Sequence, residues 1–121
     1  MQINVLLENG KFMYSVGPNN PPRYTNFTHH FNVSDQITWK YWQSNQRVIV
    51  TFETSKTDIC PFARPDNTPW PDRTATFPGD AGKLHPNFDM GRKYSRIPYS
   101  VTLPDSPGTP KDDPEVIIVN G

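Results

Sequence analysis

The sequence has a single cysteine, Cys60, among its 121 residues. One thiol excludes an internal disulfide framework and a zinc site built from several thiolates. No apolar run approaches the roughly 20 residues that a membrane-spanning helix needs. Charge of neither sign is in excess, because twelve Lys and Arg residues balance twelve Asp and Glu residues. This neutrality argues against a nucleic-acid-binding domain, which carries a basic surplus, and against a helix that lies on a membrane surface.

The first ten residues contain no basic segment of the kind that begins a secretory signal, and their apolar stretch ends at Leu7. We therefore expect a cytoplasmic protein, a location in which the thiol of Cys60 stays reduced. Two N-glycosylation sequons occur, at residues 26–28 and 32–34. The motif is short enough to arise by chance, so without a signal we do not expect it to be used.

Proline, by contrast, is abundant. The chain has fourteen prolines and seven glycines, and its proline share is about twice the usual value of roughly 5%. Because proline breaks helix interiors, this composition disfavours a helix-rich fold. The length predicts one domain that spans residues 1–121.

Apolar and polar residues alternate with a period of two along much of the chain, which is the pattern of half-buried strands. We predict strands at residues 3–7, 12–16, 36–42, 47–53, 97–103 and 115–119. Asn9 and Gly10, between the first two strands, favour a type I′ hairpin turn. Trp39 is in phase with Ile37 and Tyr41, so we expect its ring in the core.

Residues 54–92 lack this alternation and contain six of the prolines. We interpret the segment as a long proline-rich loop, with a short strand at residues 75–77 and a single helical turn at residues 87–90. Pro98 places the start of the following strand at a sheet edge or at a bulge. About seven strands in one domain, separated by Pro and Gly turns, predict an all-β fold, a Greek-key β-sandwich.

Three segments resemble parts of cupredoxin-like domains. Residues 33–39, VSDQITW, are similar to the V-x-x-G-D-x-V-x-W start of a strand in that family, with Ser34 in place of the glycine. Gly91, Tyr94 and the strand that follows resemble the G-x-Y-x-Y strand that leads to the copper cysteine of blue copper proteins, stretched by inserted residues. Residues 113–119, DPEVIIV, resemble the D-P-x-I-x-V closing strand of uncharacterised bacterial members. The resemblance spans nearly the whole chain and implies a cupredoxin-like sandwich.

The same resemblance indicates where the ligands of a copper site should lie in the sequence. A blue copper centre needs two histidines and one cysteine, with a weak axial methionine. In the family the cysteine, the second histidine and the methionine closely follow the G-x-Y-x-Y strand. Residues 99–107 contain no Cys, His or Met. The resemblance therefore implies a fold without copper, and we expect no cofactor.

An alternative is a copper site formed by Cys60, His85 and Met90, since soft sulfur and nitrogen ligands suit Cu(I). The chain would then be a copper-binding or electron-transfer protein. We favour the simpler interpretation, in which the cysteine is a small core residue and the other two fill loop positions. His29 and His30 are further candidate ligands, but neighbours on a strand point to opposite faces and do not share one metal.

Motifs for catalysis are missing. The G-x-S-x-G elbow is absent, and nothing in the sequence supplies an oxyanion hole beside Cys60. Two pairs of acids, Asp58 with Asp66 and Asp112 with Asp113, lie in proline-rich turns where we expect solvated turn formers. We therefore predict that the protein is not an enzyme.

Phosphate and nucleic-acid motifs are equally weak. Residues 79–83 hold two glycines and a lysine but lack the strand–loop–helix context of a phosphate loop. Lys83, Arg92, Lys93 and Arg96 form a local basic cluster, which suits an anion or a single strand. The neutral balance of the chain favours a solvated face instead, and we expect no nucleic-acid partner.

Large aromatic residues are the strongest candidates for a binding site. Trp42 is out of phase with Trp39, so its ring points outward if Trp39 faces the core. Phe62 and Trp70 lie in proline-fixed stretches, where exposed rings suit recognition of a protein or a sugar because they bring contact area at low entropy cost. The alternative is that the long loop folds over the sandwich and buries these two rings as a second small core.

The favoured function is a non-enzymatic, copper-free interaction module or structural subunit, which contacts a protein partner or assembles with itself and does not insert into a membrane. Two alternatives stay open. One is the copper-binding protein described above. The other is a carbohydrate-binding module built on Trp42 and Trp70, which requires secretion.

Overall fold

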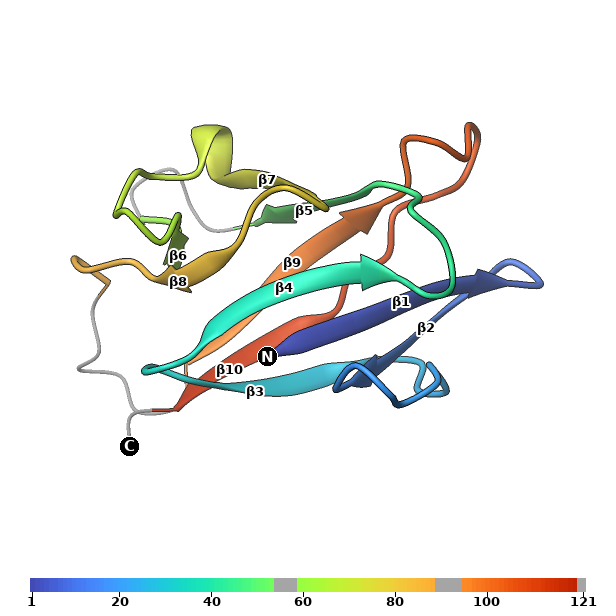
Figure 1. Ribbon diagram of the computed structural model, residues 1–121, viewed down its shortest axis with the longest axis horizontal. Coiled ribbons are helices and arrows are strands. Elements are labelled where there is room, and N and C mark those ends of the chain that lie inside the picture. The colour runs from blue at the N-terminus through green and yellow to red at the C-terminus, as the bar shows by residue number, and fades with distance from the viewer. Residues whose placement is uncertain (54–58, 89–94, 120–121) are drawn as a thin grey trace.

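A computed structural model describes residues 1–53, 59–88 and 95–119. This part of the chain forms two sheets of five strands each, packed face to face as a sandwich (Figure 1). In chain order, the strands are Gln2–Glu8 (β1), Lys11–Val16 (β2), Thr28–Asn32 (β3), Gln36–Tyr41 (β4), Val48–Phe52 (β5), Phe62–Ala63 (β6), Thr74–Phe77 (β7), Gly82–Leu84 (β8), Ser95–Thr102 (β9) and Glu115–Val119 (β10).

The first sheet has the strand order β2-β1-β4-β8-β6, and the second has the order β3-β10-β9-β5-β7. Among these strands, β1 runs parallel to β4 and β10 runs parallel to β3. The other pairs are antiparallel. Strands that are distant in sequence therefore lie side by side, and the first sheet is held together by contacts between the two halves of the chain.

The predicted all-β fold is confirmed. All six predicted strands are present, with boundaries that differ by two residues at most, and the short strand expected at residues 75–77 lies within β7. The type I′ turn between β1 and β2 is also confirmed, because Asn9 has φ 53° and Gly10 has φ 74°. This turn needs positive φ at both central positions, which is why the sequence Asn-Gly marks it.

Two expectations need correction. The described part of the segment 54–92 is not one long loop, since it contains β6, β7, β8 and a 3₁₀ turn at Pro71–Arg73. The described residues also form ten strands, three more than expected. The three additional strands are β3, β6 and β8. β6 and β8 are two and three residues long, too short for an alternating pattern to show, and β3 hides its alternation because one of its buried positions is a histidine, His29. The helical turn expected at residues 87–90 falls partly outside the described residues.

Pro98 lies in the central strand of the second sheet, not at the expected edge or bulge. Its carbonyl accepts a hydrogen bond from the backbone nitrogen of Glu53 at 3.3 Å. The N and C=O of one strand residue point to the same side, so the position of the missing N–H faces Glu53, one residue beyond the end of β5. A proline is tolerated there because the pairing of β5 with β9 ends at this point, where only the reciprocal bond to the carbonyl of Glu53 is missing.

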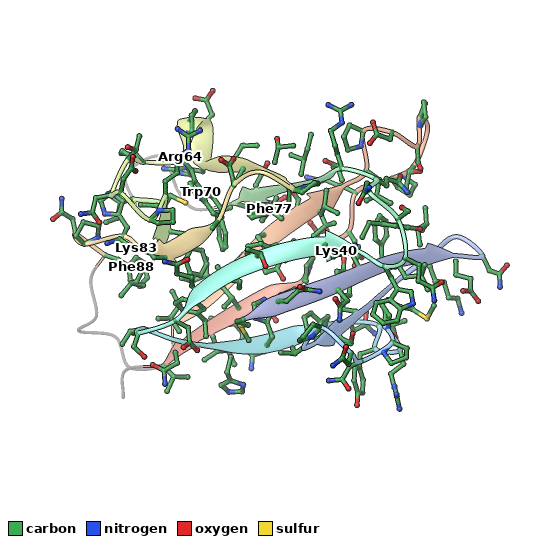
Figure 2. The ribbon with its side chains drawn as sticks, in the orientation of Figure 1. Lys40, Arg64, Trp70, Phe77, Lys83 and Phe88 are labelled. Carbon is green, nitrogen blue, oxygen red and sulfur yellow. The ribbon has the colours of Figure 1, made fainter. Side chains whose placement is uncertain are left out.

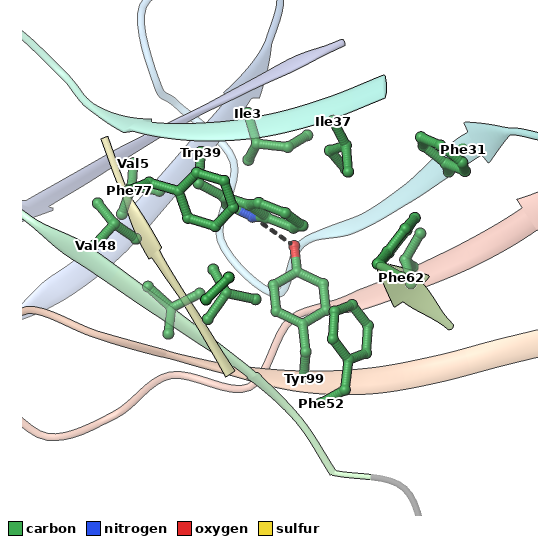
Figure 3. Packing of buried hydrophobic residues seen from close by; sticks show 14 of the residues in the cluster. Ile3, Val5, Phe31, Ile37, Trp39, Val48, Phe52, Phe62, Phe77 and Tyr99 are labelled. Atoms are coloured by element: carbon green, nitrogen blue, oxygen red, sulfur yellow. Dashed lines mark hydrogen bonds between the residues drawn. The ribbon is translucent and has the colours of Figure 1, made fainter. Parts of the chain in front are cut away.

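The core between the sheets is aromatic, and Trp39 lies at its centre with 1% of its surface exposed, as expected. The indole ring lies 5.2 Å from the ring of Phe77 and 5.5 Å from that of Tyr99 (ring centroids), and its Nε1 donates a hydrogen bond to the Tyr99 hydroxyl at 3.4 Å (Figure 3). Trp39 belongs to the first sheet and Tyr99 to the second. This pair therefore ties the two sheets together.

Within the described ranges, the structure has no helix with the length and apolar character needed to cross a membrane.

Candidate functional site

The structure places two of the predicted binding residues in the core. Phe62 is fully buried and Trp70 is 3% exposed. The ring of Phe62 lies 4.9 Å from that of Phe31, and the ring of Trp70 lies 5.9 Å from that of Phe52 (ring centroids). The prediction of exposed aromatic anchors at these two positions is therefore wrong, because the segment that carries them covers the sandwich and buries both rings. This is the alternative that the sequence analysis left open.

Trp42, the third predicted residue, is half-buried and lies outside the core cluster. It follows the last residue of β4, and its backbone nitrogen donates to the carbonyl of Val5 at 2.7 Å, which extends the pairing of β4 with β1. Leu6 and Met13, both half-buried, face each other across β1 and β2 on the same outer side of the sheet. The role of Trp42 in binding stays a prediction.

The residues of the alternative copper site are only partly within the described structure. Burial raises the pKa of the Cys60 thiol to about 11, so the group is a neutral thiol near pH 7. His85 lies in the neighbouring stretch, where its backbone nitrogen donates to the carbonyl of Pro61 at 2.8 Å and its ring Nδ1 accepts from the backbone nitrogen of Asn87 at 3.0 Å. Met90 lies outside the described residues. Within the described ranges, no three His, Cys, Asp or Glu side chains gather in a way that would hold a metal ion.

His29 and His30 lie on opposite faces of β3, as expected from their adjacent positions. His29 is buried, and its Nε2 lies 2.8 Å from the hydroxyl of Tyr99. His30 is exposed. Burial lowers the pKa of His29 to about 3.

The described members of the two predicted acidic pairs bind different partners. Asp66 accepts a hydrogen bond from the backbone nitrogen of Thr68 at 2.9 Å, and bonds to Thr68 lower the pKa of its carboxyl group. Asp112 accepts from the hydroxyl of Tyr14 at 2.7 Å, and burial together with this bond raises the pKa of that tyrosine. Asp58 lies outside the described residues. The described acids thus hold turns and loops in place.

The predicted basic cluster is also only partly described. Arg96 forms an ion pair with Glu115 at 3.4 Å, and Lys83 is half-buried on β8. Arg92 and Lys93 lie outside the described residues, so the cluster stays a prediction.

A crevice at the edge of β4 is the strongest candidate site. It has a volume of about 230 Å³. Its walls are the second half of β4 (residues 38–41), the connection after it (residues 44–46) and the chain that links β7 to β8 (residues 77–80), with Gln2 of β1 at one side. The volume is below the roughly 300–1,000 Å³ of pockets for drug-sized ligands, so the crevice is too small to enclose a ligand of that size.

The crevice exists because β8 leaves β4 early. β8 pairs only with Gln36 and Ile37, at the start of β4. Figure 1 shows β8 beside that end of β4 and the chain from β7 approaching it. Residues 38–41 are paired with β1 on one side, and on the other side the described structure gives them no strand partner. An unpaired stretch of strand is thus left open along the crevice.

Both faces of β4 contribute to the crevice. Trp39 and Tyr41 are core-facing residues, whereas Thr38 and Lys40 belong to the outer face. Figure 2 shows Lys40 beside the second half of β4 and Phe77 on the neighbouring chain from β7. Residues of alternating orientation line one hollow only when the hollow opens at the edge of the strand. The site is therefore an open sheet edge with an aromatic wall.

The two charged side chains at the crevice, Asp80 and Lys40, differ in whether an oppositely charged group lies beside them. Asp80 lies 3.4 Å from Nε of Arg64 and accepts from the backbone nitrogen of Thr76 at 3.2 Å. Among the residues that the structure describes, the ammonium group of Lys40 donates hydrogen bonds to two carbonyl oxygens, those of Tyr41 and Ser44, both at 3.4 Å. Within the described residues Lys40 has no ion pair. The crevice thus presents one cation that lacks a carboxylate.

Sequence reasoning missed this site. Its residues carry no motif, and its opening depends on where β8 ends its pairing with β4. A three-residue strand leaves no periodic signal. The only available signal was the phase of β4, which correctly assigns Trp39 to the core side.

No protein-family model matches the chain, and no curated protein matches its sequence. The function is therefore argued from geometry.

Proposed function

We propose that the chain is a non-enzymatic interaction module, a copper-free cupredoxin-like sandwich that binds a segment of a protein partner in the crevice at the edge of β4. The single observation that carries this proposal is the crevice, where an unpaired strand edge lies against an aromatic wall. Unpaired strand edges are templates for binding another chain, and folds that do not use them usually cover them.

One feature supports the cupredoxin-like part of the proposal, and two support the absence of copper. The segments that carry the resemblance lead into or form β4, β9 and β10, and these strands belong to the two sheets of a sandwich. The stretch after β9, where the family has its copper ligands, contains no Cys, His or Met. Cys60, the one thiol of the chain, is buried and uncharged in a separate segment, which also fits the cytoplasmic location that we expect.

Blocking the crevice tests the proposal. We would select short random peptides from a displayed library on the wild-type protein and measure their affinities by fluorescence anisotropy. Asn45 is exposed and lines the crevice, so Asn45→Trp fills its mouth without disturbing the core. We expect this variant to bind the selected peptides more weakly by about tenfold, the effect of losing a well-packed contact.

Asn19→Trp is the matched control. Asn19 is also exposed, but it lies after β2, which is separated from β4 by β1. This variant should bind the peptides as the wild type does. Failure to select any peptide, or equal binding by Asn45→Trp, would contradict the proposed function.

A further inference from the structure

We infer that the crevice binds an extended peptide as an added strand beside β4, and that it prefers a peptide in which apolar and acidic residues alternate. This inference rests on the proposed function and names the class of partner segment that the crevice takes.

The backbone of β4 supplies the first argument. Thr38 donates its N–H to the carbonyl of Met1 at 2.9 Å, and Trp42 donates its N–H to the carbonyl of Val5 at 2.7 Å. The even-numbered residues of β4 therefore direct their backbone groups to β1. Because these directions alternate along a strand, the N–H and C=O of Trp39 and Tyr41 point to the crevice. Only another extended backbone offers donors and acceptors at the matching spacing.

A neighbouring edge shows how the chain closes a strand that is not used. β7 is the outer strand of the second sheet. The N–H of Thr76 donates to the carboxylate of Asp80 at 3.2 Å, and the carbonyl of Thr76 accepts from the N–H of Asp80 at 3.2 Å. The chain thus caps the edge of β7 by itself. The edge of β4, on the other side of the same connection, has no backbone cap of this kind in the described structure, and the carbonyl of Tyr41 accepts only from the ammonium group of Lys40 there, at 3.4 Å.

The side chains that line the crevice indicate which residue types the added strand should carry. A strand beside β4 would direct alternate residues to the core side, where Trp39 and Phe77 form the wall of the crevice. These positions call for apolar residues. The intervening residues lie on the outer face, beside Lys40, whose ammonium group contacts two carbonyl oxygens at 3.4 Å and forms no ion pair in the described residues. These positions call for acidic residues.

Lys40 also explains why the open edge does not pair at random. A lysine on an edge strand opposes indiscriminate pairing, because its charge must be desolvated or neutralised when another strand arrives. An acidic residue removes this obstacle. Asp80, the carboxylate on the opposite wall, is held by Arg64 and by the backbone of Thr76, so it does not neutralise Lys40.

Two synthetic peptides test the preference for charge. One has the sequence Gly-Val-Asp-Val-Asp-Val-Gly, the other has lysines in place of the aspartates, and both have blocked ends. NMR titration of the full chain should show that the acidic peptide binds up to about fivefold more tightly, the upper end of the effect of one exposed ion pair. Lys40→Glu should reverse this order, whereas Lys11→Glu, an exposed lysine at the far end of β2, should not.

N-methylated peptides test the added strand. In the acidic peptide we would methylate the nitrogens of alternate residues, in two series. If the peptide is a strand beside β4, one series removes the N–H groups that face Trp39 and Tyr41 and abolishes binding, while the other series leaves it unchanged.

The outcomes separate the two proposals. Equal sensitivity of both series, or equal affinity of the acidic and basic peptides, contradicts the inference but leaves the proposed function standing if Asn45→Trp still blocks binding. Binding that Asn45→Trp does not weaken contradicts both.

Discussion

The hydroxyl group of Tyr99 is a junction between the two sheets. It accepts a hydrogen bond from Nε1 of Trp39 at 3.4 Å and lies 2.8 Å from Nε2 of His29. A hydroxyl can both donate and accept, so the tautomer of His29 determines which of the two groups donates in this contact. Burial keeps the imidazole of His29 neutral near pH 7, enclosed by the rings of Phe27, Trp39 and Tyr99.

This buried histidine predicts a loss of stability in mild acid. Burial lowers the pKa of His29 to about 3, whereas the pKa of histidine in an unfolded chain is about 6.5. Between these values the unfolded state binds a proton that the folded state does not, so the free energy of unfolding falls as the pH falls below about 6.5.

His29→Phe removes this titration. We expect the wild type to lose about 3 kcal/mol more than the variant between about pH 7 and about pH 4, because one pKa unit corresponds to about 1.4 kcal/mol. Urea unfolding of both proteins across this range measures the difference. Parallel curves would show that the pKa of His29 is the same in the folded and unfolded chain, which would contradict its burial as a neutral group.

At the scale of elements, the segment that contains β6, β7 and β8 is a structural cover. β7 joins the second sheet and β6 and β8 join the first, so the segment closes one end of the sandwich from both sides (Figure 1). Gly82 allows the close approach, because a Cβ there would lie 2.9 Å from side-chain atoms of both Ile37 and Trp70. The prolines of this segment fix its turns, and its aromatic rings are directed inward.

Trp70 tests this account of the segment. Its ring lies within 6.4 Å of the rings of Trp39, Phe52, Phe62 and Phe77 (centroid distances). Trp70→Ala should therefore lower the free energy of unfolding by about 3–5 kcal/mol, as other deletions of buried aromatic side chains do. Trp70→Phe keeps part of the contact and should cost less. An unchanged melting temperature for Trp70→Ala would place the ring outside the core.

The alternating sequence was enough to predict the long strands other than β3, because burial of one face imposes a period of two on their residues. It also assigned Trp39 to the core side of β4. It did not predict that Phe62 and Trp70 are buried, because their flanking prolines indicate rigid turns but not the direction in which a ring points. β6 and β8 were missed because pairing with distant strands, rather than their own sequence, defines them.

The candidate site was hidden from sequence analysis for a related reason. An open edge is the absence of a partner, and the partner of β4 on that side lies more than forty residues further along the chain. In the sequence, nothing distinguishes Lys40 from the other charged residues, because only the structure reveals that the neighbouring strand edge lacks a partner. Phe77 and Lys40 come together only in the folded sandwich.

At the scale of the whole molecule, the edges of the two sheets differ in whether the chain itself closes them. Tyr24 forms a bridge with Tyr14 at the outer side of β2, and Asp80 caps β7. The second half of β4 is left open between the two sheets. A neutral chain attracts partners little over long distances, so its affinity has to come from contacts made inside such a crevice.

Amide hydrogen exchange of the free protein, read residue by residue by NMR, tests the open edge most directly. Lys40 directs its N–H to β1, whereas Trp39 and Tyr41 direct theirs to the crevice. The account predicts slow exchange at Lys40 and exchange at least about tenfold faster at the two neighbours, because unpaired amides exchange through smaller openings. Equally slow exchange at all three residues would mean that the edge of β4 is already paired, which would contradict the proposed site.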